Sequence, residues 1–197
     1  MKHFHPKRYL RILKPANLYM AIRKVWYRHL STCKHVEGTW IFKQAGLMEG
    51  KGRIIGHNAQ MGYYPSSGFY DTAFYLEARY EDAVIELGRS FYNNGFAAVA
   101  EHGRISVGDD CLIGTHVSII NSDFHSLSVE RRYSGGGKSK DVRVGNNVFI
   151  GSNVSIMKGV TVGDNAVIAN GSVVFDDVAA NTVVRGNPAV FYKELTR

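Results

Sequence analysis

Residues 142–174 read VRVGNNVFIGSNVSIMKGVTVGDNAVIANGSVV, and an aliphatic residue returns at every sixth position along them. The residue that follows is Gly in half of the repeats and Ala, Met or Phe in the others. The sixfold series is Val144, Ile150, Ile156, Val162, Ile168 and Val174, and two places before its members stand Val142, Val148, Val154, Val160, Ala166 and Ser172. Unbroken spacing over six repeats indicates a repeat architecture, because a β-sandwich spaces its turns less regularly.

The same pattern extends toward the N-terminus. It covers Ile105/Val107, Cys111/Ile113 and Val117/Ile119, then Ile85/Leu87 with a slip of two residues, and Ile55-Gly56 as an outlying turn. A short strand and a tight Gly- or Asn-containing turn every six residues give a solenoid whose aliphatic rows stack inward. The sequence therefore predicts an all-β fold, a parallel β-helix over residues 39–186, with a basic helical extension (1–38) and a closing segment (187–197).

One segment interrupts the repeat. Between Ile119 and Val142 about twenty mostly polar residues intervene, among them Asp123, His125 and the run 135–137 of three glycines. A β-helix presents a smooth outer wall, so chemistry requires a loop that leaves it. Residues 121–141 are predicted to be that loop, and His125 is its most reactive side chain.

Length and composition limit the class of protein. The 197 residues suffice for one domain and a short extension. No apolar run approaches the roughly eighteen residues of a membrane span, and the basic start has no apolar core of a secretory leader. Two cysteines are too few for a disulfide framework, and Cys111 falls on a position predicted to face the core. We expect a reduced, cytoplasmic protein.

The net charge of +7 is concentrated at the N-terminus. Residues 1–36 hold nine Lys or Arg and no acid, which leaves 24 − 9 = 15 basic against 17 acidic residues in the remainder. A basic body is needed for general nucleic-acid binding, so that class of partner is not expected.

A helix is predicted in this basic segment, with Asn17 as its N-cap. Its apolar stripe consists of Leu18, Ala21, Ile22, Val25, Trp26 and Leu30. Two alternatives stay open: the helix packs on its own domain or a neighbouring subunit, or it lies on an anionic membrane through residues 1–35.

The segment VGNNVFIGSNVSIMKGVTVGDNAVIANGSVVFDDVAANTVVRGNPA resembles the hexapeptide-repeat acyltransferases over about residues 83–192. SDFHSL resembles the segment that carries the catalytic histidine in the branch that acetylates sugars and antibiotics, and VVRGNPA resembles the family's closing turn. The resemblance implies a left-handed β-helix, a homotrimer with active sites between subunits, and acetyl-CoA as acyl donor without a metal. It implies O-acetylation of a carbohydrate hydroxyl in a surface polysaccharide or a lipid-linked sugar.

The residues in the loop suit this reaction. A hydroxyl attacks a thioester when a base removes its proton, and His125 is the predicted base. Asp123 is a candidate to orient the imidazole, with Glu101 as a second one. The stretch SFYNNGF resembles the family's acceptor-binding strand, which makes Asn93 the first candidate for contact with the acceptor and Asn94 the alternative.

The resemblance also implies donor-binding positions. The pantetheine arm is expected along small residues, and the phosphates of CoA along basic ones. A backbone N–H near Gly151 is a candidate for stabilising the oxyanion. The small residues are Gly151, Ser152, Ala169, Gly171 and Ser172, and the basic ones are Lys158, Arg185 and Lys193.

Three positions depart from the family pattern: Phe149 stands where Trp is frequent, Lys158 where Pro is frequent, and Val190 where a Lys follows the closing turn. The last departure leaves Lys193 as the candidate for that phosphate contact.

Other functions stay open. N-acetylation of an amino sugar nucleotide, or acetylation of an antibiotic or serine, would use the same donor site. A metalloenzyme of the γ-carbonic-anhydrase type needs three histidines, two of them closely spaced, and the nine-residue gap from His116 to His125 does not match. A non-catalytic β-helical scaffold is the third alternative.

Overall fold

The computed structural model describes residues 14–134 and 136–196. They form helix α2 (Pro15–Leu30), a 3-10 helix η1 (Val129–Arg131) and eighteen strands. The strands are β1 (His35–Phe42), β2 (Gly46–Gly50), β3 (Arg53–Met61), β4 (Phe74–Ala78), β5 (Val84–Leu87), β6 (Phe91–Tyr92), β7 (Ala97–Ala100), β8 (Arg104–Val107), β9 (Leu112–Ile113), β10 (Ser118–Ile120), β11 (Val142–Val144), β12 (Phe149–Ile150), β13 (Ser155–Ile156), β14 (Thr161–Val162), β15 (Val167–Ile168), β16 (Val173–Val174), β17 (Thr182–Arg185) and β18 (Val190–Glu194).

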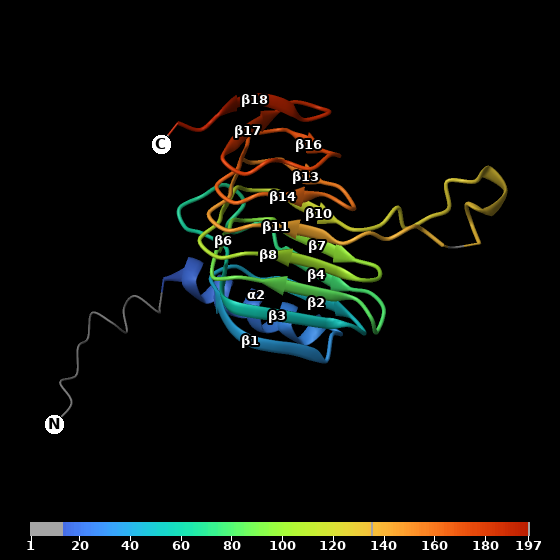
Figure 1. Cartoon of the computed structure of the whole chain (residues 1–197). Coiled ribbons are helices and arrows are strands. Elements are labelled where there is room, and N and C mark those ends of the chain that lie inside the picture. The colour runs from blue at the N-terminus through green and yellow to red at the C-terminus, as the bar shows by residue number, and fades with distance from the viewer. Residues whose placement is uncertain (1–13, 135, 197) are drawn as a thin grey trace.

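The strands stack in parallel ladders (Figure 1). One sheet runs β16-β13-β10-β7-β4-β2. The other contains twelve strands and curls, because β3 pairs with β5 through Arg53–Gly56 and with β6 through Gln60–Met61. Every strand pair is parallel except β17–β18, which closes the C-terminal end as an antiparallel hairpin. We call β2 to β17 the strand stack.

Repeats three apart pair with each other in the C-terminal half of the stack. Arg143 pairs with Thr161 and Phe149 with Val167, each eighteen residues further along the chain. Ile105 pairs with Ile85, twenty residues before it, which confirms the predicted slip of two residues. Three hexapeptides therefore return the chain to the same ladder.

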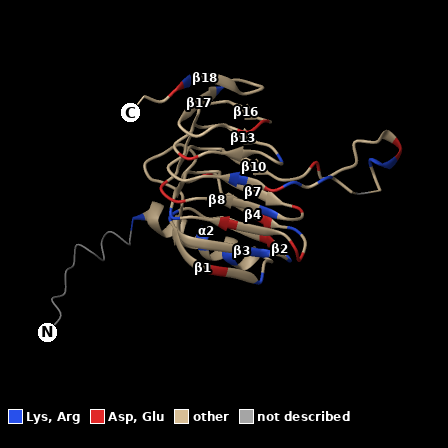
Figure 2. Cartoon of the chain, in the orientation of Figure 1, with Lys and Arg blue, Asp and Glu red and all other residues tan. Residues whose placement is uncertain are grey.

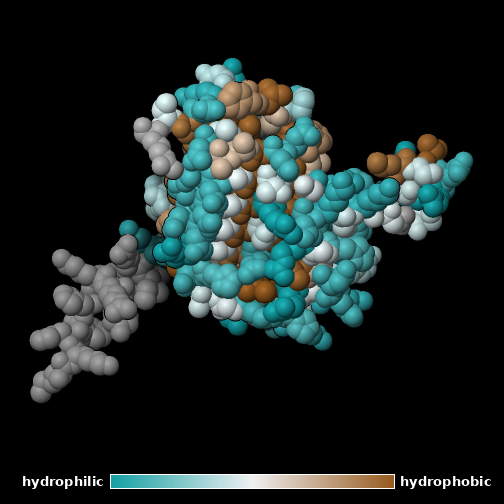
Figure 3. Space-filling model, in the orientation of Figure 1, coloured by the Kyte–Doolittle hydropathy of each residue, from teal (hydrophilic) through white to brown (hydrophobic). Residues whose placement is uncertain are grey.

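The core lies where the repeat predicts it. All twelve residues of the two series between positions 142 and 174 are buried, and Cys111 is buried among them. Alternate residues of a strand point to opposite faces, so these positions line the interior while Arg143 and Phe149 point outward. Asn147, Asn153 and Asn165 take positive φ at the turns, a conformation that Asn tolerates better than most residues. Figure 3 shows the result from outside: a mainly hydrophilic wall, with hydrophobic side chains gathered at the end that carries β18.

The interruption of the repeat does not disturb the stack. Val142 pairs with Ile105 across the loop, 37 residues away in sequence, against eighteen in the uninterrupted repeats. The loop therefore adds 37 − 18 = 19 residues at one turn and leaves the register of the strands intact. It projects far from the stack (Figure 1).

Helix α2 forms where the sequence predicts it, but the predicted N-cap, Asn17, is wrong. Its N-cap is Lys14, which makes no side-chain cap bond, and Pro15 begins the helix in the position where its missing N–H costs nothing. The predicted stripe does not pack on the chain's own body, because Leu18, Ile22, Val25 and Trp26 are all exposed. Met20, on the other side, is the buried residue of the helix.

The two predicted segment boundaries lie differently relative to the observed elements. Helix α2 ends at Leu30 and β1 begins at His35, so the boundary at residue 38 lies inside β1. The boundary at 187 lies in the turn of the β17–β18 hairpin. The basic residues before position 14 lie outside the described residues. Within the described part of the chain, no helix combines the length and apolarity that crossing a membrane requires.

Candidate active site

The loop that carries His125 is pinned at its base as a hairpin. Ser122 and Ser139 form an antiparallel bridge, and the Lys140 N–H donates to the Asn121 carbonyl at 2.8 Å. Asn121 is fully buried, and its side chain accepts from the Glu101 N–H at 2.8 Å. The start of the loop is therefore fixed to the stack although its tip stands away from it.

His125 follows a tight turn. Phe124 has φ of 60°, its N–H donates to Ser122 Oγ at 3.0 Å, and the His125 N–H donates to the Asp123 carbonyl at 2.7 Å. The imidazole is exposed, and no side chain of the described residues hydrogen-bonds to it. Both ring nitrogens are thus available to a ligand, which is what a general base requires.

The turn contacts a buried carboxylate, Glu101, and a partly buried arginine, Arg79. Ser122 Oγ donates a short hydrogen bond to Glu101 Oε2, and Glu101 is only 5% exposed. Arg79 Nη1 lies 3.9 Å from the other oxygen of Glu101. The guanidinium of Arg79 also lies over the ring of Phe124, 4.7 Å from its centroid. Glu101, the second candidate for orienting His125, therefore contacts the turn through Ser122.

The support continues along β4. Arg79 Nε donates to Glu77 Oε1 at 2.7 Å, and the Tyr75 hydroxyl donates to Glu77 Oε2 at 2.9 Å. Burial raises the pKa of Glu77, but the hydrogen bonds from Arg79 and Tyr75 outweigh it and the net pKa is lowered. Burial and the bond to Glu77 together raise the pKa of Tyr75 to about 12. Glu77 is therefore held as the carboxylate and Tyr75 as the phenol.

Asp123 pairs with Lys158. The Lys158 ammonium donates a short hydrogen bond to Asp123 Oδ2 and a second bond to the Lys138 carbonyl at 3.1 Å. The structure thus ties both branches of the loop to the turn after β13. Lys158 was expected at the CoA phosphates and Asp123 beside the imidazole of His125. In the structure the Lys158 ammonium and the Asp123 carboxylate are bound to each other instead.

A different row of turns carries the two asparagines. His116 donates its N–H to the Asn94 carbonyl, Asn153 to that of Thr115 and Gly171 to that of Ser152. We call this row of turns the groove edge: residues 93–95, 114–116, 151–153 and 169–171. The row that carries His125 we call the loop edge: residues 101–103, 121–141, 157–159 and 175–177. Positions of Lys, Arg, Asp and Glu are spread over both sides of the stack and recur in the projecting loop (Figure 2).

The two asparagines differ in role. Asn94 is fully buried, donates to the carbonyls of Tyr63 and Ser67 at 3.0 and 2.9 Å, and accepts from the Tyr63 N–H at 3.1 Å. It therefore anchors the segment after β3 and has no free group for an acceptor. The Asn93 amide is partly exposed and its nitrogen has no partner among the described residues, so Asn93 is the available contact.

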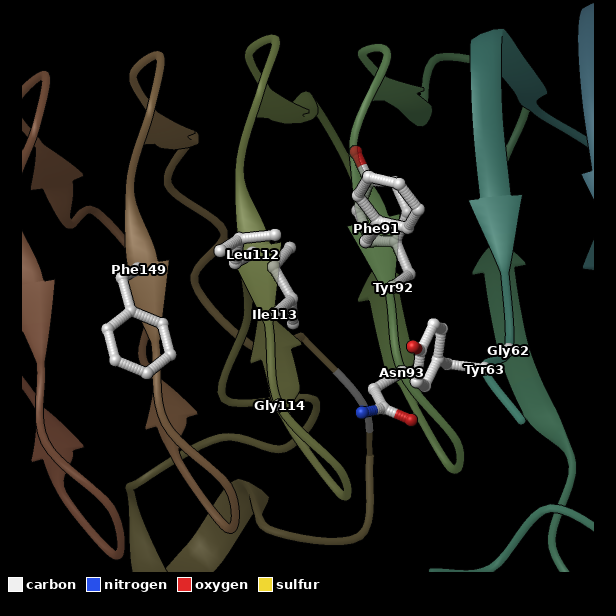
Figure 4. A pocket seen from close by; sticks show the side chains of 9 residues that line it. All are labelled: Gly62, Tyr63, Phe91, Tyr92, Asn93, Leu112, Ile113, Gly114 and Phe149. Carbon is white, nitrogen blue, oxygen red and sulfur yellow. The ribbon is translucent and has the colours of Figure 1, made fainter. Parts of the chain in front are cut away.

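Asn93 borders an apolar groove. The groove has a volume of about 340 Å³ and is lined by Gly62, Tyr63, Phe91, Tyr92, Asn93, Leu112, Ile113, Gly114 and Phe149 (Figure 4). Phe91, Leu112 and Phe149 occupy one outward ladder of β6, β9 and β12 and are about half exposed. Sequence reasoning missed this groove. Its signal is the large apolar residue directly before the inward-facing one in every third repeat, as in Phe91-Tyr92, Leu112-Ile113 and Phe149-Ile150.

Four of the five small residues predicted for the donor lie together on the groove edge. Gly151 is buried, and a Cβ there would lie 2.3 Å from Asn170 Oδ1, so only glycine fits this close approach. Ser152 follows it and accepts from the Thr115 hydroxyl at 3.0 Å. Ala169 and Gly171 lie in the turn stacked beside Gly151 and Ser152. Ser172, the next residue, is instead fully buried in the interior, where its Oγ accepts from the Gly186 N–H at 3.2 Å.

The backbone N–H groups near Gly151, predicted as oxyanion donors, have partners within the chain. The Gly151 N–H donates to the Ile168 carbonyl at 2.8 Å, and the Ser152 N–H donates to Asn170 Oδ1 at 2.7 Å. The next N–H, of Asn153, donates to the Thr115 carbonyl. All three donors are already used inside the stack.

Arg185 and Lys193 lie on the closing hairpin. The Arg185 guanidinium is 3.7 Å from the centroid of the Tyr192 ring, and the Lys193 ammonium is 5.9 Å from the same centroid. Both are exposed, so they form a basic pair at the C-terminal end of the groove edge, next to Gly186. Lys158 is not part of this group, because it lies on the loop edge.

Within one chain the predicted residues therefore form two groups. Asn93 and four of the five small residues share the groove edge, while His125, Asp123 and Lys158 share the loop edge. The loop leaves the stack on the side away from β6 (Figure 1), and His125 does not line the groove. Among the described residues, no cluster of three His, Cys, Asp or Glu side chains is arranged to hold a metal.

Family models match two parts of the stack. Residues 141–176 match the model described as bacterial transferase hexapeptide (six repeats), and residues 104–122 match the hexapeptide repeat of succinyl-transferase. A solved structure, the hexapeptide-repeat-containing acetyltransferase of Vibrio cholerae, is 30% identical, and the match covers 72% of this chain and 73% of that one with a TM-score of 0.59. The chain belongs to the hexapeptide-repeat acetyltransferase family.

Other members of the hexapeptide-repeat acetyltransferase family are also similar. Galactoside O-acetyltransferase of Escherichia coli is 38% identical over 111 residues, which are 56% of this chain and 54% of that protein. Polysialic acid O-acetyltransferase of Neisseria meningitidis is 44% identical over 69 residues, 34% of this chain and 31% of that protein. The chain thus spans about half the length, or less, of these curated relatives. The Vibrio cholerae protein has also been solved with acetyl-CoA, at 25% identity and a TM-score of 0.55 over 90% of this chain and 78% of that one.

Proposed function

We propose that the protein is an acetyl-CoA-dependent O-acetyltransferase that modifies a hydroxyl of a carbohydrate. The observation that carries the proposal is the exposed imidazole of His125 on a braced turn, in a loop inserted into the repeat of a family of acetyltransferases. The stack holds the base of the loop in place, and the loop supplies His125, the one histidine of residues 121–141, as a group suited to proton transfer near neutral pH.

In the proposed reaction, His125 accepts the proton of the acceptor hydroxyl while that oxygen attacks the thioester carbonyl of acetyl-CoA. The tetrahedral intermediate collapses with cleavage of the C–S bond. The imidazolium then returns its proton to the leaving thiolate, so the products are the acetyl ester and free CoA. Asp123 acts on this step indirectly, because its pairing with Lys158 holds the turn that positions His125.

We further propose that a second copy of the chain completes each site, in a homotrimer. The loop edge and the groove edge lie apart within one chain, so neither holds a full set of groups. The tip of the loop exposes Leu127, Val129 and Tyr133, and the groove exposes Phe91 and Phe149. Apolar surface on both partners supports docking of one copy's loop over another copy's groove.

We propose that both the acceptor and the donor bind along the groove edge. A sugar ring would stack on the aromatic side chains of the groove, and the Asn93 amide would bind one of its hydroxyls. The names of the galactoside and polysialic acid O-acetyltransferases support an acceptor of this class. The pantetheine arm would follow Gly151 and Gly171 toward Arg185 and Lys193, which take the phosphates of CoA.

We also infer that the chain winds as a left-handed parallel β-helix. Pairing of repeats three apart supports three hexapeptides in each coil. Membership of the family supports the left hand. The cytoplasmic location remains a prediction from the cysteine content.

The test uses the purified full-length chain with acetyl-CoA and a panel of sugars and amines, with release of free CoA thiol as the readout. We expect transfer to a sugar hydroxyl, and His125→Ala should lower kcat by about 10²–10⁴-fold. Acetyl-CoA should still raise the Tm of that variant, because binding to the folded state is unaffected. His57→Ala, at an exposed histidine paired with Glu86, is the matched control and should keep the wild-type rate.

Two results would count against the proposal. Transfer that proceeds unchanged in His125→Ala would remove the assigned base. Preference for an amine over every hydroxyl in the panel would turn the protein into an N-acetyltransferase with the same donor site.

A further inference from the structure

Helix α2 is attached to the body through its polar side. Arg23 donates to the Thr72 carbonyl at 2.9 Å and, through its other nitrogen, to the Tyr70 carbonyl. Lys24 donates to the Phe42 carbonyl at 3.4 Å, and Met20, nearly one turn before Arg23 and Lys24, is the buried residue of the helix. The side of an amphipathic helix that normally faces water is thus the side that faces the protein.

The opposite side is apolar and turned to solvent. Leu18, Ile22, Val25 and Trp26 follow one another at the spacing of a single helix face, and they are 58%, 59%, 71% and 63% exposed. We call these four residues the outward face. Large apolar side chains gathered on one face without a covering element mark a docking surface.

The sequence that contains α2 is basic. Residues 1–36 contain nine Lys or Arg and no Asp or Glu. Directly after the helix lies a pocket of about 500 Å³, lined by Thr32, Lys34, His35, Gly50, Lys51, Arg53 and Glu81. Arg53 forms a two-bond ion pair with Glu37, but the ammonium groups of Lys34 and Lys51 have no partner among the described residues.

These observations favour an anionic partner. A second copy docked by the same face would bring two segments of like charge together, which costs free energy. A membrane that contains anionic lipids offers apolar depth for the four side chains and phosphate for the free ammonium groups. We propose that the outward face of α2 and the adjacent basic pocket dock the protein on an anionic membrane surface.

This docking places the N-terminal end of the stack at the lipid. Helix α2 and β1 lie at the same end of the molecule, opposite β18 (Figure 1). The helix would lie in the plane of the interface, because its polar side stays bound to Tyr70 and Thr72. The proposal is independent of the proposed function, since none of its residues belongs to the groove edge or the loop edge.

The test measures flotation of the full-length chain with vesicles. Phosphatidylglycerol–phosphatidylcholine vesicles are compared with vesicles of phosphatidylcholine alone, at low and high salt. We expect binding to the anionic vesicles alone, weakened by salt, with a blue shift of tryptophan emission that Trp26→Phe abolishes. Absence of flotation with anionic vesicles at low salt would overturn the proposal.

Two variants separate the contributions. Ile22→Ser/Val25→Ser/Trp26→Ser should weaken binding at least about tenfold by removing inserted apolar area. Lys34→Glu/Lys51→Glu should weaken it by about tenfold at low salt, with a smaller effect at high salt. Phe175→Ser, at a residue 51% exposed in a turn of the loop edge, is the control and should bind as the wild type.

Light scattering of the apolar triple variant completes the test. We expect the same oligomeric mass as the wild type. A variant that floats like the wild type, or one that loses its oligomeric mass, would show that the outward face contacts protein and would overturn the proposal.

Discussion

Lys158 and Asp123 lie 35 residues apart in the chain, and their side chains meet at the base of the loop that carries His125. Both side chains are about three-quarters buried. The ion pair joins the inserted loop to the uninterrupted part of the stack, and it lies two residues from the proposed base. Its role is therefore expected to be positional.

We predict that Lys158→Met lowers kcat by about tenfold, since a looser turn misplaces His125. The KM for acetyl-CoA should stay the same, because Lys158 is bound to Asp123 and not directed to the donor site. Steady-state kinetics with varied acetyl-CoA measures both values. A raised KM for acetyl-CoA with an unchanged kcat would restore the phosphate-binding role that the sequence suggested.

Arg79→Met tests the support below the turn. It leaves the Glu77 carboxylate and the buried Glu101 carboxylate without their cation, so we expect a loss of about 2–4 kcal/mol in the free energy of unfolding. Urea denaturation measures it. Arg143→Met, at an exposed arginine 3.5 Å from Asp141, should cost less than about 1 kcal/mol. Equal losses in the two variants would show that the buried network adds nothing.

Substitution of Asn94 should mainly lower stability, whereas substitution of Asn93 should mainly affect activity. Asn94→Ala removes a buried amide bound to the backbone of Tyr63 and Ser67, and we expect a loss of about 2–3 kcal/mol in stability. Asn93→Ala should cost less than about 1 kcal/mol but raise the KM for the acceptor. Thermal unfolding and acceptor kinetics on both variants test this. Equal acceptor kinetics in Asn93→Ala and the wild type would remove Asn93 from the site.

Glu77 gives the fold an acid-sensitive component. Its lowered pKa means that the ionised form stabilises the fold, so this contribution is present above the pKa of the unfolded chain, about 4.3. It is lost as the pH falls through the lower pKa of the folded state. We predict that wild-type stability drops more steeply than that of Glu77→Gln below about pH 4.5. Parallel stability curves for the two proteins in acid would contradict the assignment.

The interior of the stack was predictable because it follows from spacing alone. Ile150 and Ile156 point inward for the same reason that Phe149 points outward, namely the alternation of a strand. The two-residue slip at Ile85 was also visible as a change of spacing. Local period therefore determines which residues form the core.

Contacts between distant turns were not predictable in the same way. The partner of Asp123 depends on which turn stacks beside the loop, and Lys158 reaches it from 35 residues away. Asn93 and Asn94 are adjacent and chemically identical, yet the path of residues 62–67 makes one structural. The orientation of helix α2 was unpredictable for a related reason. Its apolar stripe is visible in the sequence, but the contacts that turn its polar side to the body are made by Arg23 with the distant carbonyls of Tyr70 and Thr72.

The unchanged strand register across the loop has an evolutionary consequence. Because Val142 resumes the pairing that Ile105 would have made with the next repeat, the nineteen extra residues add surface without altering the frame. Insertions or deletions between His125 and Lys138 can therefore be sampled at little cost to folding. A protein built in this way can change what the tip of its loop contacts by altering one hairpin, while selection keeps the groove edge and the interior as they are.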